Sequence, residues 1–591
     1  WVAARATCRG HVGCTAPGRM GGTMGMDRRE FVKAAGAGAA LVAVGGSRDL
    51  LAAEGEAADL ILTRGAILTM DDRLPEAAAM AVRNGRVLAV GAVDAMEALR
   101  GPQTRTIDLG GRGVTPGLID AHSHPISFGQ MELMFIVIRP PAVDSYRSLA
   151  RVLKAAAKDK APGEWILARG FQEFKEGRWP HREELDEILP KHPLLMIHWG
   201  GQFGIANTLA LEQAGLLKTD VRNPYGGVYL RDRRNNLPNG VLVHYPAIYS
   251  VYRPRLDEED QARCARWALE QFNRVGVTCV HDNFVDPRYA RTYVQLERSG
   301  ELTARVRVYP YMWNLEQTRQ VIDRMMRYRG PLVRFQGLKL AVDGYALMYD
   351  TPAEHREMAI PMHPEDTFRE IVQAIHDAGL QVDVHAVGDK GVDWTLDAFE
   401  RAAGSPAAVR ERRHRIEHFP FRRLESIRRA AGLGVPVCQQ PFFIDFRVDD
   451  FRRRKSAISK EYLHTSVPLR TMLKEGVPLA FGADVPAFPS HRPLDSIRCA
   501  MRRVTGEGQA LDPAEQIPFA EALRVHTAGS AYAAFDESEL GSLAVGKQAD
   551  FVVWNRDLRI VKAAADLDSL AVAGTYLAGR SVYTASGAAL E

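Results

Sequence analysis

A central block of the chain alternates short apolar runs with stretches in which apolar residues recur at helical spacing, and this order restricts the fold more than any other feature. Strands are predicted at residues 117–122, 165–170, 194–198, 276–281, 336–342, 381–385, 414–418, 435–439 and 477–482. Helices are predicted at residues 144–159, 258–275, 365–378, 393–403, 421–432 and 468–476, with Gly379, Gly432 and Gly476 as residues that end helices. Strands that alternate with helices indicate βα units in a parallel sheet, and their number indicates a barrel-like α/β fold.

Short β-rich segments flank this block at both ends of the chain. They cover residues 59–69 and 79–91 on one side and residues 541–554 and 572–583 on the other, with a hairpin signal at Asn84-Gly85. Because chain termini often lie close together in a domain, these segments predict one small β-sandwich built from both ends. The predicted domains are the N-terminal part of the sandwich at 59–113, a barrel at 114–540 with an insertion at about 126–257, and the C-terminal part of the sandwich at 541–591.

The insertion is longer than an ordinary βα connection and carries large aromatic residues. These residues are Trp165, Phe171, Trp179, Trp199 and Phe203. Aromatic residues in such a segment more often form the core of an inserted subdomain than the wall of a pocket. If some of them line a pocket, the substrate has an apolar or aromatic part.

Composition excludes several classes of function. The chain has 591 residues, of which 46% are hydrophobic and 25% charged, so it can bury a large core and form a second domain. The net charge is only +4 with dispersed basic residues, and the run 452–455 is interpreted as a solvated face, so nucleic acid is not an expected partner. The six cysteines are widely spaced without a CxxC pair, and we expect small buried residues rather than a disulfide scaffold.

The first residues indicate export. Residues 1–23 have no periodic pattern and suggest a wrongly assigned start upstream of Met24 or Met26. A charged segment with paired arginines at 27–33 then precedes a Gly/Ala-rich apolar stretch at 34–46, which resembles a twin-arginine-type signal peptide. A disordered tail is the alternative, and the apolar stretch is too short for a stable membrane span. Residues 1–58 are therefore predicted to be an upstream segment with a signal read by the twin-arginine export machinery, which predicts a periplasmic or secreted bacterial protein.

Polar side chains stand where several predicted strands end. His122 and His124 close the first strand and point the same way in an extended chain, so their imidazoles can bind one metal ion. His385, His418 and Asp484 close later strands. In a barrel of βα units, function lies at the carboxyl ends of the strands. Each residue alone could be satisfied in a core or turn, but together they predict a metal centre.

Lys339 lies inside the apolar strand at 336–342, where an unpaired ammonium group is costly. Two explanations stay open. One is a salt bridge, with Asp343 as a candidate partner. The other is a lysine carboxylated by carbon dioxide, which would form an anionic bridge between two metal ions.

The set His122-x-His124, Lys339, His385, His418 and Asp484, in this order along βα units, resembles the metal-dependent amidohydrolase superfamily. Over about residues 59–583 the chain is similar to its amidohydrolase 3 branch, which includes N-substituted formamide deformylase. The closer likeness rests on Lys339-Leu340-Ala341-Val342-Asp343-Gly344, Val384-His385-Ala386-Val387-Gly388-Asp389, Arg415-Ile416-Glu417-His418, Asn207-Thr208-Leu209-Ala210-Leu211, and residues 180–190 and 540–554. The resemblance implies a TIM-like (β/α)8 barrel with a small split β-sandwich.

The resemblance also implies roles for these residues. His122, His124 and Asp484 would hold one divalent metal ion, with His385 and His418 holding a second and carboxylated Lys339 between the two. Zinc is the favoured metal, although manganese and iron suit such sites almost equally and one or two ions are compatible with the branch. A bound metal lowers the pKa of water from 15.7 to about 7 and so supplies hydroxide. Asp484 would transfer the proton, with His385 and His418 as further catalytic residues.

The predicted function is hydrolysis of a non-peptide carbon–nitrogen bond in a small molecule, with an amide or N-substituted formamide favoured. The alternatives are hydrolysis of an ester, lactone or imine, and a metal-binding scaffold without catalysis. The branch often has a Gly-His before the Asn-x-x-Ala-Leu stretch, where this chain has Gln202. A glutamine side chain can donate a hydrogen bond to a substrate carbonyl but, unlike histidine, cannot titrate. Gln202, Asp343 and Asp389 are predicted to bind substrate. The sequence leaves the oligomeric state open, including a homo-oligomer.

Overall fold

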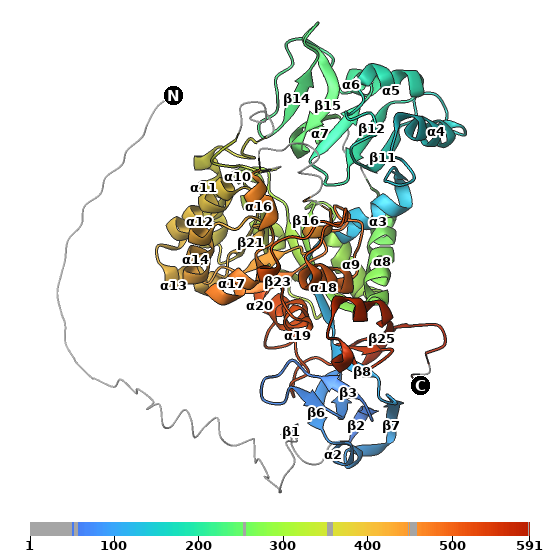
Figure 1. Cartoon of the computed structure of the whole chain (residues 1–591), viewed down its shortest axis with the longest axis vertical. Coiled ribbons are helices and arrows are strands. Elements are labelled where there is room, and N and C mark those ends of the chain that lie inside the picture. The colour runs from blue at the N-terminus through green and yellow to red at the C-terminus, as the bar shows by residue number, and fades with distance from the viewer. Residues whose placement is uncertain are drawn as a thin grey trace, which may run out of the picture.

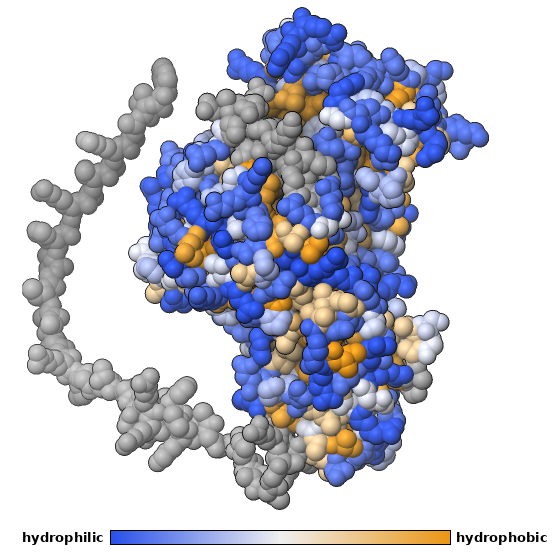
Figure 2. Space-filling model, in the orientation of Figure 1, coloured by the Kyte–Doolittle hydropathy of each residue, from blue (hydrophilic) through white to orange (hydrophobic). Residues whose placement is uncertain are grey.

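The computed structural model describes residues 50–51, 57–251, 256–344, 346–351, 359–446, 448, 458–588 and 590. Figure 1 shows three regions along the longest axis of the molecule. The terminal strands lie at one end, a body of parallel strands and helices lies in the middle, and the insertion lies at the other end. The face shown in Figure 2 is largely hydrophilic, with apolar residues in small groups.

Two parallel sheets form the centre of the body. The four-stranded sheet has the order β18-β17-β16-β9, with β9 (Leu118–Ser123), β16 (Val277–Val285), β17 (Arg305–Pro310) and β18 (Val333–Phe335). The five-stranded sheet has the order β19-β20-β21-β22-β23, with β19 (Gly337–Ala341), β20 (Gln381–Ala386), β21 (Arg415–His418), β22 (Val437–Gln439) and β23 (Leu479–Phe481). Both sheets are entirely parallel, as the alternation of strands and helices predicts.

The two sheets approach each other at both edges. On one side an isolated parallel bridge joins Tyr311 to Lys339. On the other side the Asp484 N–H donates to the His122 carbonyl at 2.7 Å, and the His124 N–H donates to the Val485 carbonyl at 2.9 Å. Within the described ranges the strand pairing does not run continuously around a closed ring.

Amphipathic helices cover the body, and their buried residues join those of the strands in one large core. The predicted helices occur as α8 (Glu258–Arg274), α11 (Glu365–Asp377), α12 (Asp389–Ala403), α14 (Leu424–Leu433) and α17 (Leu469–Glu475). Gly379 and Gly476 follow α11 and α17 with φ of 75° and 86°, the left-handed conformation that glycine adopts readily. The prediction for Gly432 is wrong, because it lies inside α14 and Gly434 ends that helix with φ of 66°.

The insertion is a subdomain with its own mixed sheet. Its strands have the order β10-β11-β12-β13-β15-β14 and comprise β10 (Ile136–Val137), β11 (Ile166–Phe171), β12 (Leu194–His198), β13 (Phe203–Ala206), β14 (Val228–Arg231) and β15 (Pro238–Val243). The sheet packs against α4 (Tyr146–Ala157), α5 (Arg182–Ile188), α6 (Thr208–Gln213) and α7 (His244–Val251). Strands predicted at 165–170 and 194–198 therefore exist, but they belong to this sheet and not to the central βα units.

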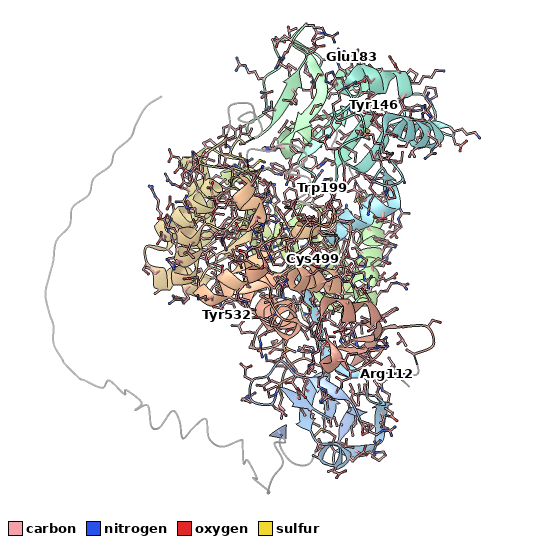
Figure 3. The ribbon with its side chains drawn as sticks, in the orientation of Figure 1. Arg112, Tyr146, Glu183, Trp199, Cys499 and Tyr532 are labelled. Atoms are coloured by element: carbon pink, nitrogen blue, oxygen red, sulfur yellow. The ribbon has the colours of Figure 1, made fainter. Side chains whose placement is uncertain are left out.

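Most of the insertion's aromatic residues are structural, as predicted. Phe171 and Phe203 are fully buried in hydrophobic clusters of the molecule. Trp199 packs edge-to-face against Phe446 at a ring distance of 4.6 Å and contacts Phe488 at 5.5 Å. Figure 3 shows Trp199 where the insertion meets the body. These contacts fix one edge of the insertion over the central strands.

Strands from both ends of the chain share a sheet. One terminal sheet has the order β1-β6-β5-β2-β7, with β1 (Leu50–Leu51), β2 (Ala58–Thr63), β5 (Ala79–Arg83), β6 (Arg86–Gly91) and β7 (Arg100–Asp108). The other has the order β26-β25-β24-β8-β3-β4, with β3 (Ala66–Leu68), β4 (Glu76–Ala77), β8 (Gly113–Pro116), β24 (Phe551–Trp554), β25 (Val572–Leu577) and β26 (Arg580–Thr584). β24 pairs with β8, and Phe551 and Val553 join Leu62 and Val82 in one buried cluster.

Some sequence predictions fall outside the described residues. They concern the export segment at 27–46, the basic run at 452–455, and Cys8 and Cys14. The other four cysteines are free and buried, as predicted. No helix in the described ranges is both long enough and apolar enough to cross a membrane.

Candidate functional site

The polar residues predicted at strand ends meet at one cavity. Its volume is about 920 Å³, including space open to solvent. Because the carboxyl ends of parallel strands share one edge, residues far apart in sequence converge there. The predicted site residues that line the cavity are His122, His124, Gln202, Lys339, His385, His418 and Asp484.

The backbone bends sharply at two of these positions. His418 is the last residue of β21 and has φ of 77°, and Asp484 follows β23 with φ of 54°. Non-glycine residues rarely adopt this conformation, and when they do they cluster at functional sites. Gly482 permits the close approach of β23 to β9, because a Cβ there would lie 2.4 Å from the His122 nitrogen.

His122, His124 and Asp484 form a compact cluster of potential ligands, which we call the strand-end cluster. One ligand atom from each lies within 4.8 Å of the others. The Asp484 Oδ1 atom is 3.0 Å from His124 Nε2 and 3.5 Å from His122 Nε2. His418 extends the cluster, with its ring 5.0 Å from that of His122 and 4.4 Å from that of His385.

Burial controls the charge of these histidines. It lowers the pKa of His124 to about 4, that of His418 to about 3, and that of His385 well below 6.5. Burial also acts against protonation of His122, but the Glu417 and Asp484 carboxylates outweigh it and raise the pKa of His122 to about 9. Burial alone would raise the pKa of Asp484, yet His122 and His124 hold it well below 3.8, so this carboxylate is ionised.

The strand-end cluster fits a divalent metal ion. Its donors are imidazole nitrogens and a carboxylate, which are the ligands that zinc and neighbouring metals take. His124 keeps a buried Nδ1 atom that has no hydrogen-bond partner among the described residues. The raised pKa of His122 shows that the two nearby carboxylates favour a positive charge at this point.

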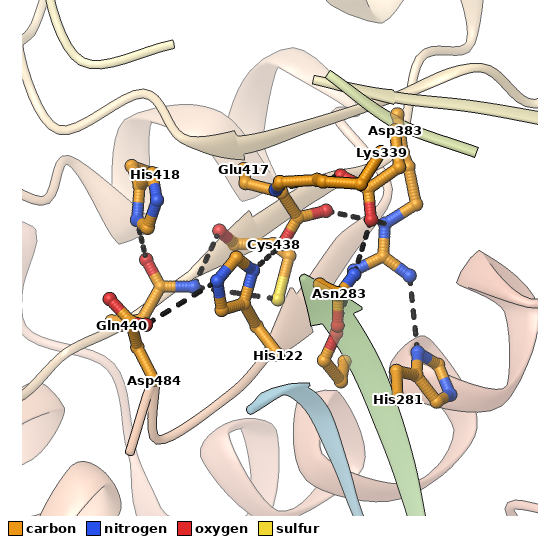
Figure 4. Close-up of polar contacts among 12 residues, drawn as sticks. His122, His281, Asn283, Lys339, Asp383, Glu417, His418, Cys438, Gln440 and Asp484 are labelled. Atoms are coloured by element: carbon orange, nitrogen blue, oxygen red, sulfur yellow. Dashed lines mark hydrogen bonds and ion pairs between the residues drawn. The ribbon is translucent and has the colours of Figure 1, made fainter. Parts of the chain in front are cut away.

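Buried polar residues behind the cavity hold the histidines in place (Figure 4). The Glu417 carboxylate contacts His122 Nδ1, and Arg415 Nε donates to Glu417 at 2.5 Å. His418 Nδ1 donates to the Gln440 carbonyl oxygen at 2.6 Å. Such partners orient metal-binding imidazoles and fix their tautomer. No role was predicted for Glu417, Arg415 or Gln440. Arg415 and Glu417 are two residues apart in a predicted buried strand, so their side chains lie on the same face, and this pattern could have indicated a buried polar group.

Lys339 is paired in the structure. Its Nζ atom donates to Asp383 Oδ1 at 3.0 Å, and Asn283 also contacts the Asp383 carboxylate. The suggested partner Asp343 was wrong, because parallel β19 and β20 place Lys339 directly beside Asp383. Carboxylation of Lys339 remains a prediction.

Asp343 and Asp389 do not line the cavity, although Asp343 Oδ1 lies 3.6 Å from His385 Nε2, and their contact with substrate remains a prediction. The Asp343 carboxylate accepts hydrogen bonds from the backbone N–H groups of Leu347 and Gly388, both at 2.8 Å. Asp389 accepts from the Tyr462 hydroxyl at 3.0 Å. These carboxylates fix the loops that follow β19 and β20, a function that strand-end position alone cannot distinguish from binding.

The insertion supplies the opposite wall of the cavity. Arg169 extends from β11, and Gly200, Gly201 and Gln202 lie between β12 and β13. Tyr245 and Tyr249 of α7 stack at a ring distance of 6.3 Å, and Tyr245 packs at 4.9 Å against Phe284. The cavity therefore combines a polar floor with a partly aromatic wall. Sequence analysis missed Arg169, Tyr245 and Tyr249.

Comparisons with known proteins agree with this arrangement. Residues 105–583 match the amidohydrolase family. The chain is 30% identical over 568 residues to protein LONG AFTER FAR-RED 3 of Arabidopsis thaliana, which covers 90% of this chain and 92% of that protein. It is 26% identical over 553 residues to N-substituted formamide deformylase of Arthrobacter pascens, covering 90% of this chain and 99% of that enzyme. The crystal structure of an uncharacterized metal-dependent hydrolase from Pyrococcus horikoshii OT3 superposes with a TM-score of 0.67 at 25% identity, covering 85% of this chain and 98% of that one.

Proposed function

The chain belongs to the amidohydrolase family and is a metal-dependent hydrolase acting on carbon–nitrogen bonds, and from this premise we propose that its substrate is a small amide or N-substituted formamide. The observation that carries the proposal is the strand-end cluster, in which two histidines and an ionised aspartate face one cavity. The similarity to N-substituted formamide deformylase supports the choice of bond.

We propose that the two central sheets belong to one (β/α)8 barrel, which spans residues 114–540 and is interrupted by the insertion. In it β18 and β19, separated by Gln336 alone, count as one strand. The hydrogen bonds between the His122 and Asp484 regions and the Tyr311–Lys339 bridge support this reading. We propose that the two terminal sheets form the split β-sandwich of the family, from residues 59–113 and 541–591. Their common buried cluster supports it.

His122, His124 and Asp484 would hold a divalent metal ion, with zinc as the proposed metal. When bound, such an ion polarises a carbonyl and brings the pKa of water close to neutral. His385, His418 and Lys339 lie at the same cavity and are the proposed ligands of a second ion. Glu417 holds His122 in orientation through its Nδ1 atom, which leaves Nε2 directed at Asp484.

Asp484 is the proposed base and acid of the reaction. Its carboxylate is ionised and faces the cavity, so it can accept a proton from the attacking water. The same carboxylic acid can then protonate the leaving nitrogen as the carbon–nitrogen bond breaks. Proton transfer of this kind accelerates a reaction by about 10²–10⁴-fold. Gln202 can donate a hydrogen bond to the substrate carbonyl from the insertion side.

The test is an assay of purified, metal-loaded protein on matched formamides, N-acyl amines and esters. Preferential turnover of formamides or amides is expected. Turnover of esters alone would favour the alternative reaction class. No turnover of any member at full metal occupancy would favour a scaffold without catalysis.

A further inference from the structure

Arg169 is a half-buried cation in the cavity wall that forms no ion pair with a carboxylate of the described residues. It lies in β11 of the insertion and borders both the main cavity and an adjoining cavity of about 870 Å³. No carboxylate of the described residues lies within ion-pair distance of its guanidinium group. Its Nε atom is buried and lacks a hydrogen-bond partner in the same described ranges. Burial lowers the pKa of Arg169, and the opposing effects of Tyr249, Tyr245 and Asp484 do not fully offset it.

Other cations near Arg169 are compensated. Arg139, also in the insertion, pairs with Glu132 at 2.6 Å. Arg288 borders the adjoining cavity and pairs with Asp286 at 2.6 Å, and Lys339 pairs with Asp383. Even partial removal of a charge from water is costly when the charge has no ion-pair partner, so the retention of Arg169 at a cavity indicates that a ligand supplies the partner.

The surroundings of Arg169 restrict the chemistry of that ligand. A planar guanidinium group binds a carboxylate through two parallel hydrogen bonds. A single uncompensated cation matches one negative charge, whereas a phosphate monoester carries up to two. Tyr249 and Phe284 border both cavities beside Arg169 and offer aromatic contacts to the body of the ligand.

We propose that Arg169 binds a carboxylate group of the substrate, so that the enzyme acts on a formamide or amide that carries a carboxylate at its far end. The identity of the bond that is cleaved in this substrate rests on the proposed function. Arg169 is therefore a specificity-determining residue. It selects the substrate, while the strand-end cluster performs the reaction.

The experiment compares two substrates that differ in one group. These are para-(formamidomethyl)benzoate and its uncharged carboxamide, measured with wild-type, Arg169→Gln, Arg169→Lys and Arg139→Gln proteins. Wild type should prefer the carboxylate. Arg169→Gln should lower kcat/KM for the carboxylate by about 100-fold, mainly through KM, while the carboxamide value stays nearly unchanged. Arg169→Lys should restore part of the preference, and Arg139→Gln should keep it in full. An equal loss on both substrates in Arg169→Gln would overturn the proposal.

A binding measurement separates this proposal from the proposed function. Calorimetric titration of the metal-loaded proteins with para-toluate, para-toluamide and para-tolyl phosphate needs no turnover. Para-toluate should bind wild type better than para-toluamide, and that difference should vanish in Arg169→Gln. Equal binding of toluate to both proteins, or tighter binding of the phosphate, would overturn the carboxylate assignment. Far-UV circular dichroism and thermal unfolding establish that each variant is folded. If Arg169→Gln does not fold, the binding difference between para-toluate and para-toluamide is measured in Arg169→Lys instead.

Discussion

Three clusters among the described residues contain the residue types that bind metals, and two of them that share no residue have different surroundings. The strand-end cluster of His122, His124 and Asp484 faces the cavity. A second group, which we call the arginine-paired cluster, consists of Cys279, His281 and Asp536. In both clusters one ligand atom of each residue lies within 4.8 Å of the others. Distance and residue type therefore do not separate them.

Counter-charges separate the two clusters. Asp536 forms ion pairs with Arg307, at 2.5 Å, and with Arg334. His281 accepts a hydrogen bond from Arg415 at 3.1 Å. A divalent ion in the arginine-paired cluster would meet three guanidinium groups and the single carboxylate of Asp536. An ion in the strand-end cluster would meet the Asp484 and Glu417 carboxylates, and the nearby Lys339 ammonium group is paired with Asp383. The comparison teaches that the net charge around potential ligands decides whether they form a metal site or a structural ion-pair network.

The largest expected effect is that of Asp484→Asn. This substitution keeps the shape of the side chain but removes the group proposed to transfer the proton. We expect kcat to fall by about 10²–10⁴-fold on the best substrate from the formamide panel, while the fold persists. Steady-state kinetics with circular dichroism measures both. Activity close to wild type would contradict the assignment of Asp484.

The matched substitution Asp536→Asn should give the opposite phenotype. It leaves buried Arg307 without its counter-charge, and breaking a buried ion pair costs about 3–5 kcal/mol. Urea unfolding should show this loss, while kcat per folded molecule stays close to wild type. Loss of metal with unchanged stability would contradict the structural role of Asp536.

His281→Asn should change the pH dependence of stability. Burial, together with Arg415 and Arg307, lowers the pKa of His281 well below 6.5, while Glu417 opposes this shift, so the folded protein keeps the ring neutral. The unfolded chain binds a proton below its ordinary pKa of 6.5, and stability therefore falls as the pH decreases. Between about pH 7 and about pH 5.5 this residue should account for about 1 kcal/mol of the loss.

The His281→Asn protein should lose less stability than wild type between about pH 7 and about pH 5.5, although its stability at neutral pH is lower. Urea unfolding of the metal-free proteins at a series of pH values measures the difference. Identical pH profiles for the two proteins would show that His281 binds a proton equally well in the folded and unfolded states, which would contradict the lowered pKa.

The sequence identified the strand ends well, because apolar runs and turn residues are local signals. His122, His124, His385, His418 and Asp484 all reach the cavity for this reason. β17 was missed, since its arginines at 305 and 307 read as surface residues until Asp550 and Asp536 are brought to them by the fold. The contact between Glu417 and His122 joins residues 295 positions apart, and no local pattern predicts such a partner.

Residues with the correct chemistry can also have the wrong surroundings. Asp343 and Asp389 follow strands as Asp484 does, but neither lines the cavity, and their carboxylates accept hydrogen bonds from backbone N–H groups and from the Tyr462 hydroxyl. Arg169 was missed because its significance is the absence of an ion pair with any carboxylate of the described residues, and a sequence does not show that absence. Pairing in three dimensions therefore decides the role of each charged residue.

An anomalous difference map from a crystal of the metal-loaded protein, recorded at the absorption edge of its metal, tests the central claim most directly. We predict a peak among His122, His124 and Asp484, with a second peak near His385 and His418 only if Lys339 carries the additional density of a carboxylate. A peak at Cys279, His281 and Asp536, or no peak at the strand-end cluster in protein with full metal content, would contradict the account.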